Sequence, residues 1–507
     1  MTVWSVDART GDRRGEYAES SAEQVDQACR TAQATLRALD AAGPRGRAEL
    51  LDAIAAELEA AGDALVAAAD AETALGGPRL TGEVARSAGQ FRLFARVLRE
   101  GSFLDVRIDH ADGSTTPPTP DLRRMNVPFG VVAVFAASNF PLAFSVCGGD
   151  TASALAAGCP VVVKAHPLHP ETSEIALAAL RAGARKAGLP EEVVHLVHGQ
   201  EAGITLVNHP LVKAVGFTGS VPGGRYLHDV AKARPEPIPF YGELGSLNPL
   251  VITPGAAEAR AAAIASGLAA SATLGSGQFC TKPGLVLAPA TEAGRALVEA
   301  LAGHFTETGP QVLLGDGIRG GFLSGADARS SLPGVTVAAT GKPGDDRQVT
   351  ARLLTAPATL LADDKAAELL LEECFGPLTV VLTYEDEDEL VATLSATPGN
   401  LTATLHSEPG EEELAARLVS VLRDRAGRLV FNGYPTGVAV AWAQQHGGPY
   451  PSATEPATTS VGTAAIFRFL RPVAYQDTPP ALLPEALRDD NPLGVPRHVD
   501  GVLDVPR

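Results

Sequence analysis

One cysteine stands in a setting that suits a nucleophile. The segment GSGQFCTKPG at residues 275–284 places Cys280 between glycine-rich turns, whose backbone N–H groups can lower the pKa of a thiol. Free cysteines are usually buried and inert. That is the alternative for Cys280 and the expected state of the other four cysteines, Cys29, Cys147, Cys159 and Cys374. The flanking glycines and Lys282 favour a reactive thiol at Cys280 alone.

Two further residues could serve such a nucleophile. Glu243, in FYGELGSLNP, follows an apolar approach and precedes a Gly-Ser turn, a setting that desolvates a carboxylate and raises its strength as a general base. Asn139, in AASNFPLAFS, comes just after an apolar run, where its amide could donate to a developing oxyanion. A solvated surface Glu and a turn-forming Asn are the alternatives.

From Val127 onward, β-branched runs alternate with helical stretches. These elements must position the candidate residues. Strands separated by helices predict parallel βαβ units, which bind ligands at the carboxyl ends of the strands. The loop GFTGS at 216–220 precedes a helix, so it suits the binding of a phosphate group. A plain tight turn is the alternative interpretation of this loop. The four expected strands are GVVAVFA (130–136), PVVVK (160–164), VVHLVH (193–198) and VKAVGFTG (212–219).

The rest of the chain divides by pattern. Residues 22–100 have helical periodicity, with a capping box from Ser21 to Gln24 at the start. A second α/β block runs from Leu247 to about Phe431, with strands expected at LVLAP (285–289) and LTVVLTY (378–384). The segment SVGTAAIFRFLRPVAYQ (460–476) has strand character and is expected to pair with an extended arm at 104–125.

Composition excludes several classes of protein. The 507 residues are 45% hydrophobic, and a net charge of −18 repels nucleic acid. Charges lie where the apolar core of a signal peptide would be, so we expect a cytoplasmic protein. The Ala-rich stretch at 256–275 lacks the apolar residues of a membrane span and is expected to be a packed helix. Five cysteines without a C-x-x-C pair predict neither a disulfide framework nor a metal site.

Six motifs occur together in one order: ASNFP (137–141), VVVK (161–164), GFTGS (216–220), GELGS (242–246), GQFC (277–280) and EECFGP (372–377). In order and approximate spacing they resemble the aldehyde dehydrogenase superfamily over nearly the whole chain. The version ASNFPLAFS and the tail from FNGYPTGVAV to FRFLRPV look most like one branch. That branch holds the bacterial α-ketoglutarate-semialdehyde (2,5-dioxopentanoate) dehydrogenases and the Vibrio-type NADP-dependent fatty aldehyde dehydrogenase.

The resemblance implies an α/β fold with a Rossmann-type cofactor domain, an α/β catalytic domain and a small β oligomerisation arm. It places the parts along this sequence as the cofactor-binding domain at 1–103 and 127–246, the arm at 104–126 and 460–480, the catalytic domain at 247–431, active-site loops at 432–459 and a surface-hugging C-terminal extension at 481–507. The arm implies a homodimer or homotetramer, because its edges are too exposed for a monomer.

For catalysis, the resemblance implies that Cys280 attacks an aldehyde and that Asn139, with the backbone N–H of Cys280, holds the oxyanion. Hydride then leaves for a nicotinamide, and Glu243 activates the water that hydrolyses the thioester. His446, in QQHGGPYP, would lie near the cysteine and influence its reactivity, with a loop-stabilising role as the alternative.

On the cofactor side, the resemblance places Lys164 at the adenosine ribose, Ser220 at the pyrophosphate, and Glu373 and Phe375 at the nicotinamide ribose. Our other candidate cofactor contacts are His166, Gly219 and Gly223. Many NAD-preferring relatives carry a Glu three residues after the lysine, where this chain has Pro167. The stretch 164–169 has no acid and is expected to be partly cationic, so we predict that NADP is preferred and NAD is the alternative.

The expected substrate is 2,5-dioxopentanoate, which would be oxidised to 2-oxoglutarate, and fatty or other medium-chain aldehydes are the alternative. Ser138, where many members have Trp, and Thr281-Lys282 depart from the wider family and leave the substrate open. Lys282 could contact an acidic substrate, or it could be an outward-facing lysine. A non-catalytic nucleotide-binding protein and a phosphorylating or coenzyme-A-acylating enzyme are further alternatives, disfavoured because Cys280, Glu243 and Asn139 are all present.

Overall fold

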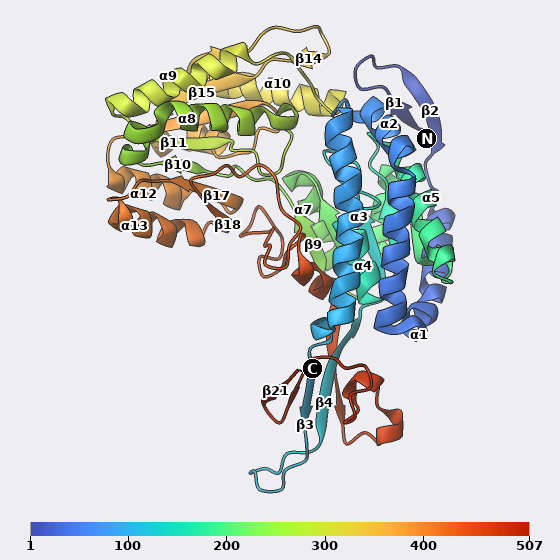
Figure 1. Ribbon diagram of the computed structural model, residues 1–507. Helices are drawn as coiled ribbons and strands as arrows, with labels where there is room; N and C mark the ends of the chain where they lie inside the picture. Colours follow the sequence, from blue (N-terminus) through green and yellow to red (C-terminus); the bar gives the residue numbers. More distant parts are fainter. Residues whose placement is uncertain (1, 506–507) are drawn as a thin grey trace.

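The computed structural model describes residues 2–505 as two α/β bodies and a narrow β arm that projects from one of them (Figure 1). The first body contains a five-stranded parallel sheet in the order β7-β6-β5-β8-β9. Its strands are β5 (Val131–Phe135), β6 (Val161–Lys164), β7 (Val194–Val197), β8 (Val212–Thr218) and β9 (Phe240–Glu243). The four strands expected here are therefore confirmed, and β9 adds a fifth that ends on Glu243.

Helices connect these strands and cover the sheet. The crossovers are α4 (Gly149–Ala157), α5 (Pro170–Lys186), α6 (Gln200–Asn208) and α7 (Val221–Lys232). The N-terminal segment adds the hairpin β1 (Thr2–Val6) and β2 (Arg13–Ala18), followed by α1 (Ala22–Ala60), α2 (Gly62–Thr73) and α3 (Gly77–Glu100). The predicted capping box is present, because Ser21 and Gln24 bond reciprocally at the start of α1.

The second body is built on a seven-stranded sheet in the order β13-β15-β16-β11-β10-β17-β18. Only β13 runs antiparallel to its neighbour. The strands are β10 (Leu250–Ile252), β11 (Leu285–Pro289), β13 (Thr336–Thr340), β15 (Arg352–Pro357), β16 (Leu378–Tyr384), β17 (Asn400–His406) and β18 (Ala426–Phe431). The expected strands at 285–289 and 378–384 are confirmed as neighbours in this sheet.

The helices of the second body lie on both faces of its sheet (Figure 1). They are α8 (Pro254–Thr273), α9 (Glu292–Glu307), α10 (Asp316–Ser330), α11 (Asp364–Leu370), α12 (Glu387–Ala396) and α13 (Glu412–Arg423), with a small ribbon of β12 (Gln311–Val312) and β14 (Gln348–Val349). The Ala-rich stretch is the packed helix α8, as expected. Among residues 2–505, no helix combines the length and the apolar composition needed to cross a bilayer.

The arm is a five-stranded sheet in the order β19-β4-β3-β20-β21. Its strands are β3 (Val106–Asp109), β4 (Leu122–Pro128), β19 (Leu470–Gln476), β20 (Arg497–Val499) and β21 (Val502–Asp504). The predicted pairing of the arm with the C-terminal strand is confirmed by the antiparallel register of β19 on β4. Residues 463–469, however, form the 3₁₀ helix η5 (Thr463–Phe469) and not a strand.

The C-terminal extension does more than follow the surface. It carries η6 (Pro480–Leu482) and η7 (Glu485–Leu487), and its last strands cover the free edge of β3. Asp500 (φ 48°) and Gly501 (φ 79°) form the two-residue turn between β20 and β21, and Asp-Gly is a known hairpin signal. The other 3₁₀ helices are η1 (Ser102–Leu104), η2 (Glu191–Val193), η3 (Leu274–Gly277) and η4 (Ala358–Ala362).

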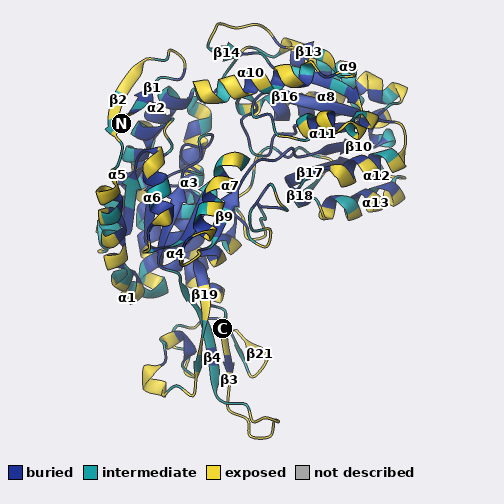
Figure 2. Cartoon of the chain, turned by 180° about the vertical axis from the view of Figure 1, so that it is seen from behind, coloured by how far each residue is buried: buried dark blue, intermediate teal, exposed yellow. Residues whose placement is uncertain are grey.

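The two bodies contain more buried residues than the arm. Figure 2 shows buried residues concentrated in the sheets of both bodies and exposed residues on the outer helix faces and the arm. Each sheet has apolar side chains packed on both faces, as parallel sheets require. The two sheets therefore hold the loops that leave them in fixed positions, and these loops face one another.

Candidate active site

The loop that carries Cys280 is tightly constrained. It follows α8 through η3, where Gly275 (φ 56°), Ser276 (φ 60°) and Gly277 (φ 66°) are all in the left-handed region. A Cβ on Gly277 would lie 2.4 Å from the carbonyl oxygen of Gly376, so only glycine fits this contact. The turn thus fixes where the thiol stands relative to the segment that leads into β16.

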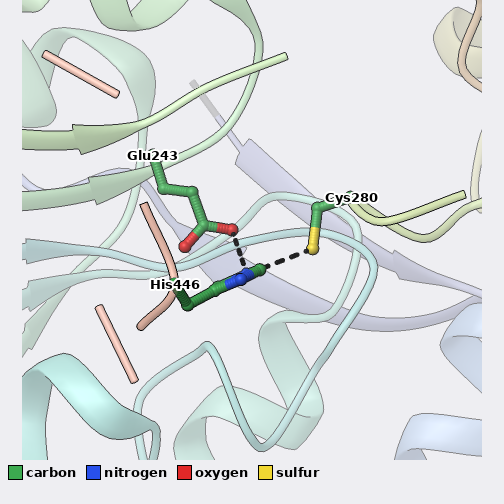
Figure 3. Close-up of side chains that lie close together, drawn as sticks. All are labelled: Glu243, Cys280 and His446. Atoms are coloured by element: carbon green, nitrogen blue, oxygen red, sulfur yellow. Dashed lines mark hydrogen bonds and ion pairs between the residues drawn. The ribbon is translucent and has the colours of Figure 1, made fainter. Parts of the chain in front are cut away.

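Three predicted residues meet at this thiol (Figure 3). The Nε2 atom of His446 lies 3.6 Å from Sγ of Cys280 and 2.9 Å from Oε1 of Glu243. One ligand atom from each of the three residues lies within 4.8 Å of the others. Sequence analysis left the role of His446 open, and the structure places it between the thiol and the carboxylate. The same three atoms are close enough to hold a metal ion, which the sequence did not predict.

The electrostatics of this group favour a resting thiol beside an ionised carboxylate. Desolvation, with the charges of Glu243 and Glu373, raises the pKa of Cys280 well above its ordinary value. Burial alone would raise the pKa of Glu243, but the His446 contact and a short hydrogen bond from Ser460 leave it below the ordinary value. The Cys280 proton can pass to Nε2 of His446, or directly to Glu243 across the side-chain hydrogen bond that joins the two groups.

Asn139 stands in the loop after β5 and touches the cysteine loop. Its Nδ2 donates to the carbonyl oxygen of Gln278 at 2.9 Å, which uses one of its two amide protons. Arg79 of α3 donates to the Asn139 carbonyl at 2.6 Å and holds the backbone in place. The second amide proton is free to donate to another acceptor.

A cavity of about 650 Å³ opens beside Cys280, and both bodies contribute to its lining. Its volume suits a dinucleotide end and a small substrate. Leu168 and Thr218 come from the first body, and Phe322 and Arg329 from the second. Seven predicted site residues also line it: Asn139, His166, Gly219, Ser220, Cys280, Glu373 and Phe375.

The amino end of α7 meets this cavity at Ser220. This residue is the N-cap of α7, and its hydroxyl accepts a hydrogen bond from the backbone N–H of Gly223. Gly223 therefore lies in the first turn and not in the cavity lining. Free N–H groups and the helix dipole at this end suit a phosphate group, so a dinucleotide fits here.

Glu373 lines the same cavity. Burial raises its pKa to about 7, with the nearby charge of Lys282 acting in the other direction. A Cβ on Gly245 would come within 2.8 Å of its Oε2, so the glycine in GELGS leaves room for this carboxylate. The Glu373 carboxylate and the Phe375 ring thus offer a polar and an apolar surface at one wall of the cavity.

The expectation that Lys282 contacts the substrate is corrected by the structure. Its Nζ donates to the carbonyl oxygens of Cys374 and Leu378, at 2.9 and 2.8 Å. The side chain is buried and does not line the cavity beside Cys280. Lys282 is neither outward-facing nor a substrate contact, and it joins the cysteine loop to the segment that carries Glu373.

The expected positive charge of residues 164–169 is also corrected in part. Desolvation lowers the pKa of His169 to about 4 and that of His166 well below its ordinary value, so both imidazoles are neutral. Lys164 ends β6, and burial lowers its pKa to about 8. The ammonium of Lys164 is therefore the cation of this stretch, but Lys164 does not line the cavity beside Cys280, and the charge of Glu19 acts on it.

Sequence reasoning missed two residues that hold this site together. Ser460 donates to Glu243, and the Thr459 hydroxyl accepts from the backbone N–H of His446 at 2.8 Å. Both stand in TTSVG, where nothing local marks a catalytic role. Only the folded structure reveals these two residues. Glu243 forms an isolated β-bridge with Ala453, and this bridge brings the 446–460 segment alongside β9.

Comparison with known proteins gives one consistent family. Residues 2–471 match the aldehyde dehydrogenase family. The chain is 48% identical over 489 residues to alpha-ketoglutaric semialdehyde dehydrogenase 2 of Azospirillum brasilense, with 94% of this chain and 91% of that protein covered. It is 41% identical over 505 residues to alpha-ketoglutaric semialdehyde dehydrogenase of Acinetobacter baylyi, with 99% and 96% covered.

Solved structures share the fold at lower identity. A mutant of aldehyde dehydrogenase C from Pseudomonas syringae, complexed with NAD+ and octanal, has a TM-score of 0.79 at 22% identity, with 95% of both chains covered. PnpE in complex with nicotinamide adenine dinucleotide has a TM-score of 0.80 at 23% identity, with 94% of this chain and 95% of that chain covered. The α/β fold expected from the sequence is thereby confirmed.

The raised pKa of the thiol predicts how Cys280 reacts with an alkylating agent. Because the thiolate is the reactive form, alkylation by iodoacetamide should speed up continuously from pH 7 to pH 9. Peptide mass spectrometry would follow each cysteine separately. Cys29 and Cys147 are buried with pKa values raised to about 12, and they serve as internal controls that stay unlabelled. A rate that is already constant at pH 7 would contradict the resting thiol.

Proposed function

The chain belongs to the aldehyde dehydrogenase family, and we propose that it oxidises 2,5-dioxopentanoate (α-ketoglutarate semialdehyde) to 2-oxoglutarate with a nicotinamide dinucleotide. It is an enzyme that oxidises aldehydes. The observation that carries the proposal is the cluster of Cys280, His446 and Glu243 beside a cavity lined by Asn139. The two nearly full-length relatives named above support the substrate.

In the proposed reaction, Sγ of Cys280 attacks the aldehyde carbon after its proton passes to His446 or Glu243. The carbonyl oxygen becomes an oxyanion, which takes hydrogen bonds from Nδ2 of Asn139 and the backbone N–H of Cys280. A bound nicotinamide supplies the acceptor for the hydride that leaves this carbon. A thioester to Cys280 remains.

Glu243 is proposed to act a second time. The proton first taken from Cys280 is released to solvent, so the Glu243 carboxylate is again free to act as a base. It then takes a proton from water, the water oxygen attacks the thioester carbon, and Cys280 leaves as the thiolate. The product is a free acid. A buried carboxylate beside the thioester supports hydrolysis over transfer of the acyl group to phosphate or coenzyme A.

The cofactor contacts are proposed on the fit of the site. Ser220, Gly219 and Gly223 would hold the pyrophosphate at the amino end of α7. Lys164 and His166 would face the adenosine ribose, and Glu373 with Phe375 the nicotinamide ribose. The lining of one cavity by five of these seven residues supports the assignment.

The substrate is tested by steady-state kinetics with 2,5-dioxopentanoate beside hexanal and decanal. We expect kcat/KM to favour the keto-acid aldehyde by more than about tenfold, or roughly 1.4 kcal/mol of transition-state discrimination. Cys280→Ala is the control and should abolish every oxidation. Preference for the long aldehydes would replace this substrate with a fatty one, and activity in Cys280→Ala would overturn the mechanism.

The role of Glu243 is tested by Glu243→Gln in rapid-mixing experiments. Without the base, the thioester should accumulate, so about one equivalent of reduced cofactor should form in a burst before a steady rate that is about 100-fold slower or more. Quenched-flow mass spectrometry should find the acyl group on Cys280. A steady rate equal to that of the unmodified enzyme would exclude Glu243 as the base.

We further propose that NADP is preferred over NAD. The support is Pro167, which stands where many NAD-preferring relatives have a ribose-binding Glu, together with the Lys164 ammonium. Pro167→Glu should raise KM for NADP about tenfold or more, because a carboxylate repels the 2′-phosphate, and leave KM for NAD little changed or lower. Equal KM values for both cofactors in the unmodified enzyme would contradict the preference.

A homodimer or homotetramer formed through the arm is proposed from the exposed strands. On β21, Val502 is 68% and Leu503 58% exposed, and such an apolar edge strand invites pairing with a second copy. Light scattering after size-exclusion chromatography should give two or four times the chain mass. Removal of residues 497–507 should shift the mass towards one chain. A monomer in the intact protein would refute this assembly.

A further inference from the structure

Two arginines hold the loop 435–438 beside the nucleophile. Nη1 of Arg86, on α3, donates to the Val438 carbonyl at 2.7 Å. Arg428, on β18, donates to the carbonyl oxygens of Gly437 and Pro435, at 3.0 and 2.6 Å. The backbone N–H of Gly437 donates in turn to Oγ1 of Thr281, the residue after Cys280, at 3.3 Å. Both guanidinium groups therefore belong to the immediate surroundings of the thiol.

These guanidinium groups have donors to spare. Nε and Nη2 of Arg86 and Nε of Arg428 are buried and have no hydrogen-bond partner among residues 2–505. Within the same described range, neither arginine forms an ion pair with a carboxylate. By contrast, Arg79, about two turns earlier on α3, is paired with Glu83, although its Nη1 also has no hydrogen-bond partner within that range. Buried, unpaired cationic donors are costly unless a ligand satisfies them.

Neither arginine lines the cavity described above, but the loop 435–438 brings both close to Cys280. Desolvation lowers the pKa of Arg86 and of Arg428, and a thiolate at Cys280 would oppose that effect at both residues. The guanidinium carbon of Arg86 lies 5.3 Å from the Phe144 ring centre, and that ring lies 6.2 Å from the His446 ring. An aromatic surface thus extends from Arg86 to the catalytic cluster and suits a short chain of methylene groups.

We propose that Arg86, supported by Arg428, binds the carboxylate of the substrate at the end remote from the aldehyde. Nε and Nη2 form the side edge of the guanidinium group, which matches a carboxylate through two parallel hydrogen bonds. Four C–C bonds separate the two ends of 2,5-dioxopentanoate, a span of about 5 Å. The inference rests on the proposed function and names the contact that selects an acidic aldehyde.

The test compares Arg86→Gln with the unmodified enzyme on 2,5-dioxopentanoate and on pentanal, an uncharged aldehyde of equal chain length. The ratio of their kcat/KM values should fall about tenfold to a hundredfold, mainly through KM for the keto acid, because a charge-assisted contact is lost. Arg86→Lys should recover part of the ratio, since it keeps the charge without the two-pronged edge. The matched control is Arg96→Gln, which removes the same charge from an exposed position on α3 and should leave the ratio unchanged.

The outcomes separate the two proposals. If the unmodified enzyme does not prefer the keto acid to pentanal, the proposed substrate fails, whatever Arg86 does. If the preference exists and Arg86→Gln retains it, the carboxylate contact is overturned. Equal losses on both substrates, accompanied by a lower melting temperature, would also overturn it, because Arg86 would then act only through the Val438 carbonyl.

Discussion

The site depends on one buried contact, in which Nε2 of His446 faces both Glu243 and Cys280. It joins residues separated by 166 positions, and it buries a carboxylate that desolvation would otherwise neutralise. Such a group is stable only when its oxygens have partners. Ser460 and His446 supply those partners, and the rest of the local structure serves to bring them to the end of β9.

Two rigid sheets and two immobilised loops achieve that placement. Glu243 is fixed because it ends β9, and Leu244 then donates to the carbonyl oxygen of Ser452 at 2.8 Å. Cys280 is fixed by the left-handed turn at Gly277 and by Asn139 on the Gln278 carbonyl. A catalytic group held by packing and backbone bonds loses little entropy when substrate arrives. The cavity lies where the loops of the two sheets meet.

Features that are local in sequence could be predicted, and features that arise from burial could not. The apolar runs predicted the strands, and the motifs singled out Cys280 and Glu243, whose ligand atoms the structure brings within 4.8 Å of each other. The neutral state of His166 could not be predicted, because its lowered pKa comes first from burial in the folded chain. Ser460 was missed for the same reason, since its partner lies 217 positions away. The hairpin at Asp500-Gly501 had a local signal, and it was overlooked.

Lys282 and Arg86 show why nearness in sequence is a poor guide to substrate contact. Lys282 follows the nucleophile by two residues, yet two carbonyl oxygens satisfy its ammonium within the core. Arg86 lies on a helix of the other body, and only one of its donors is used. A buried cation held by carbonyl oxygens has little left to offer a ligand, whereas a buried cation with several free donors is unfavourable until a ligand binds. Hydrogen-bond satisfaction therefore distinguishes a structural charge from a recognition charge, and it can be assessed only once the chain is folded.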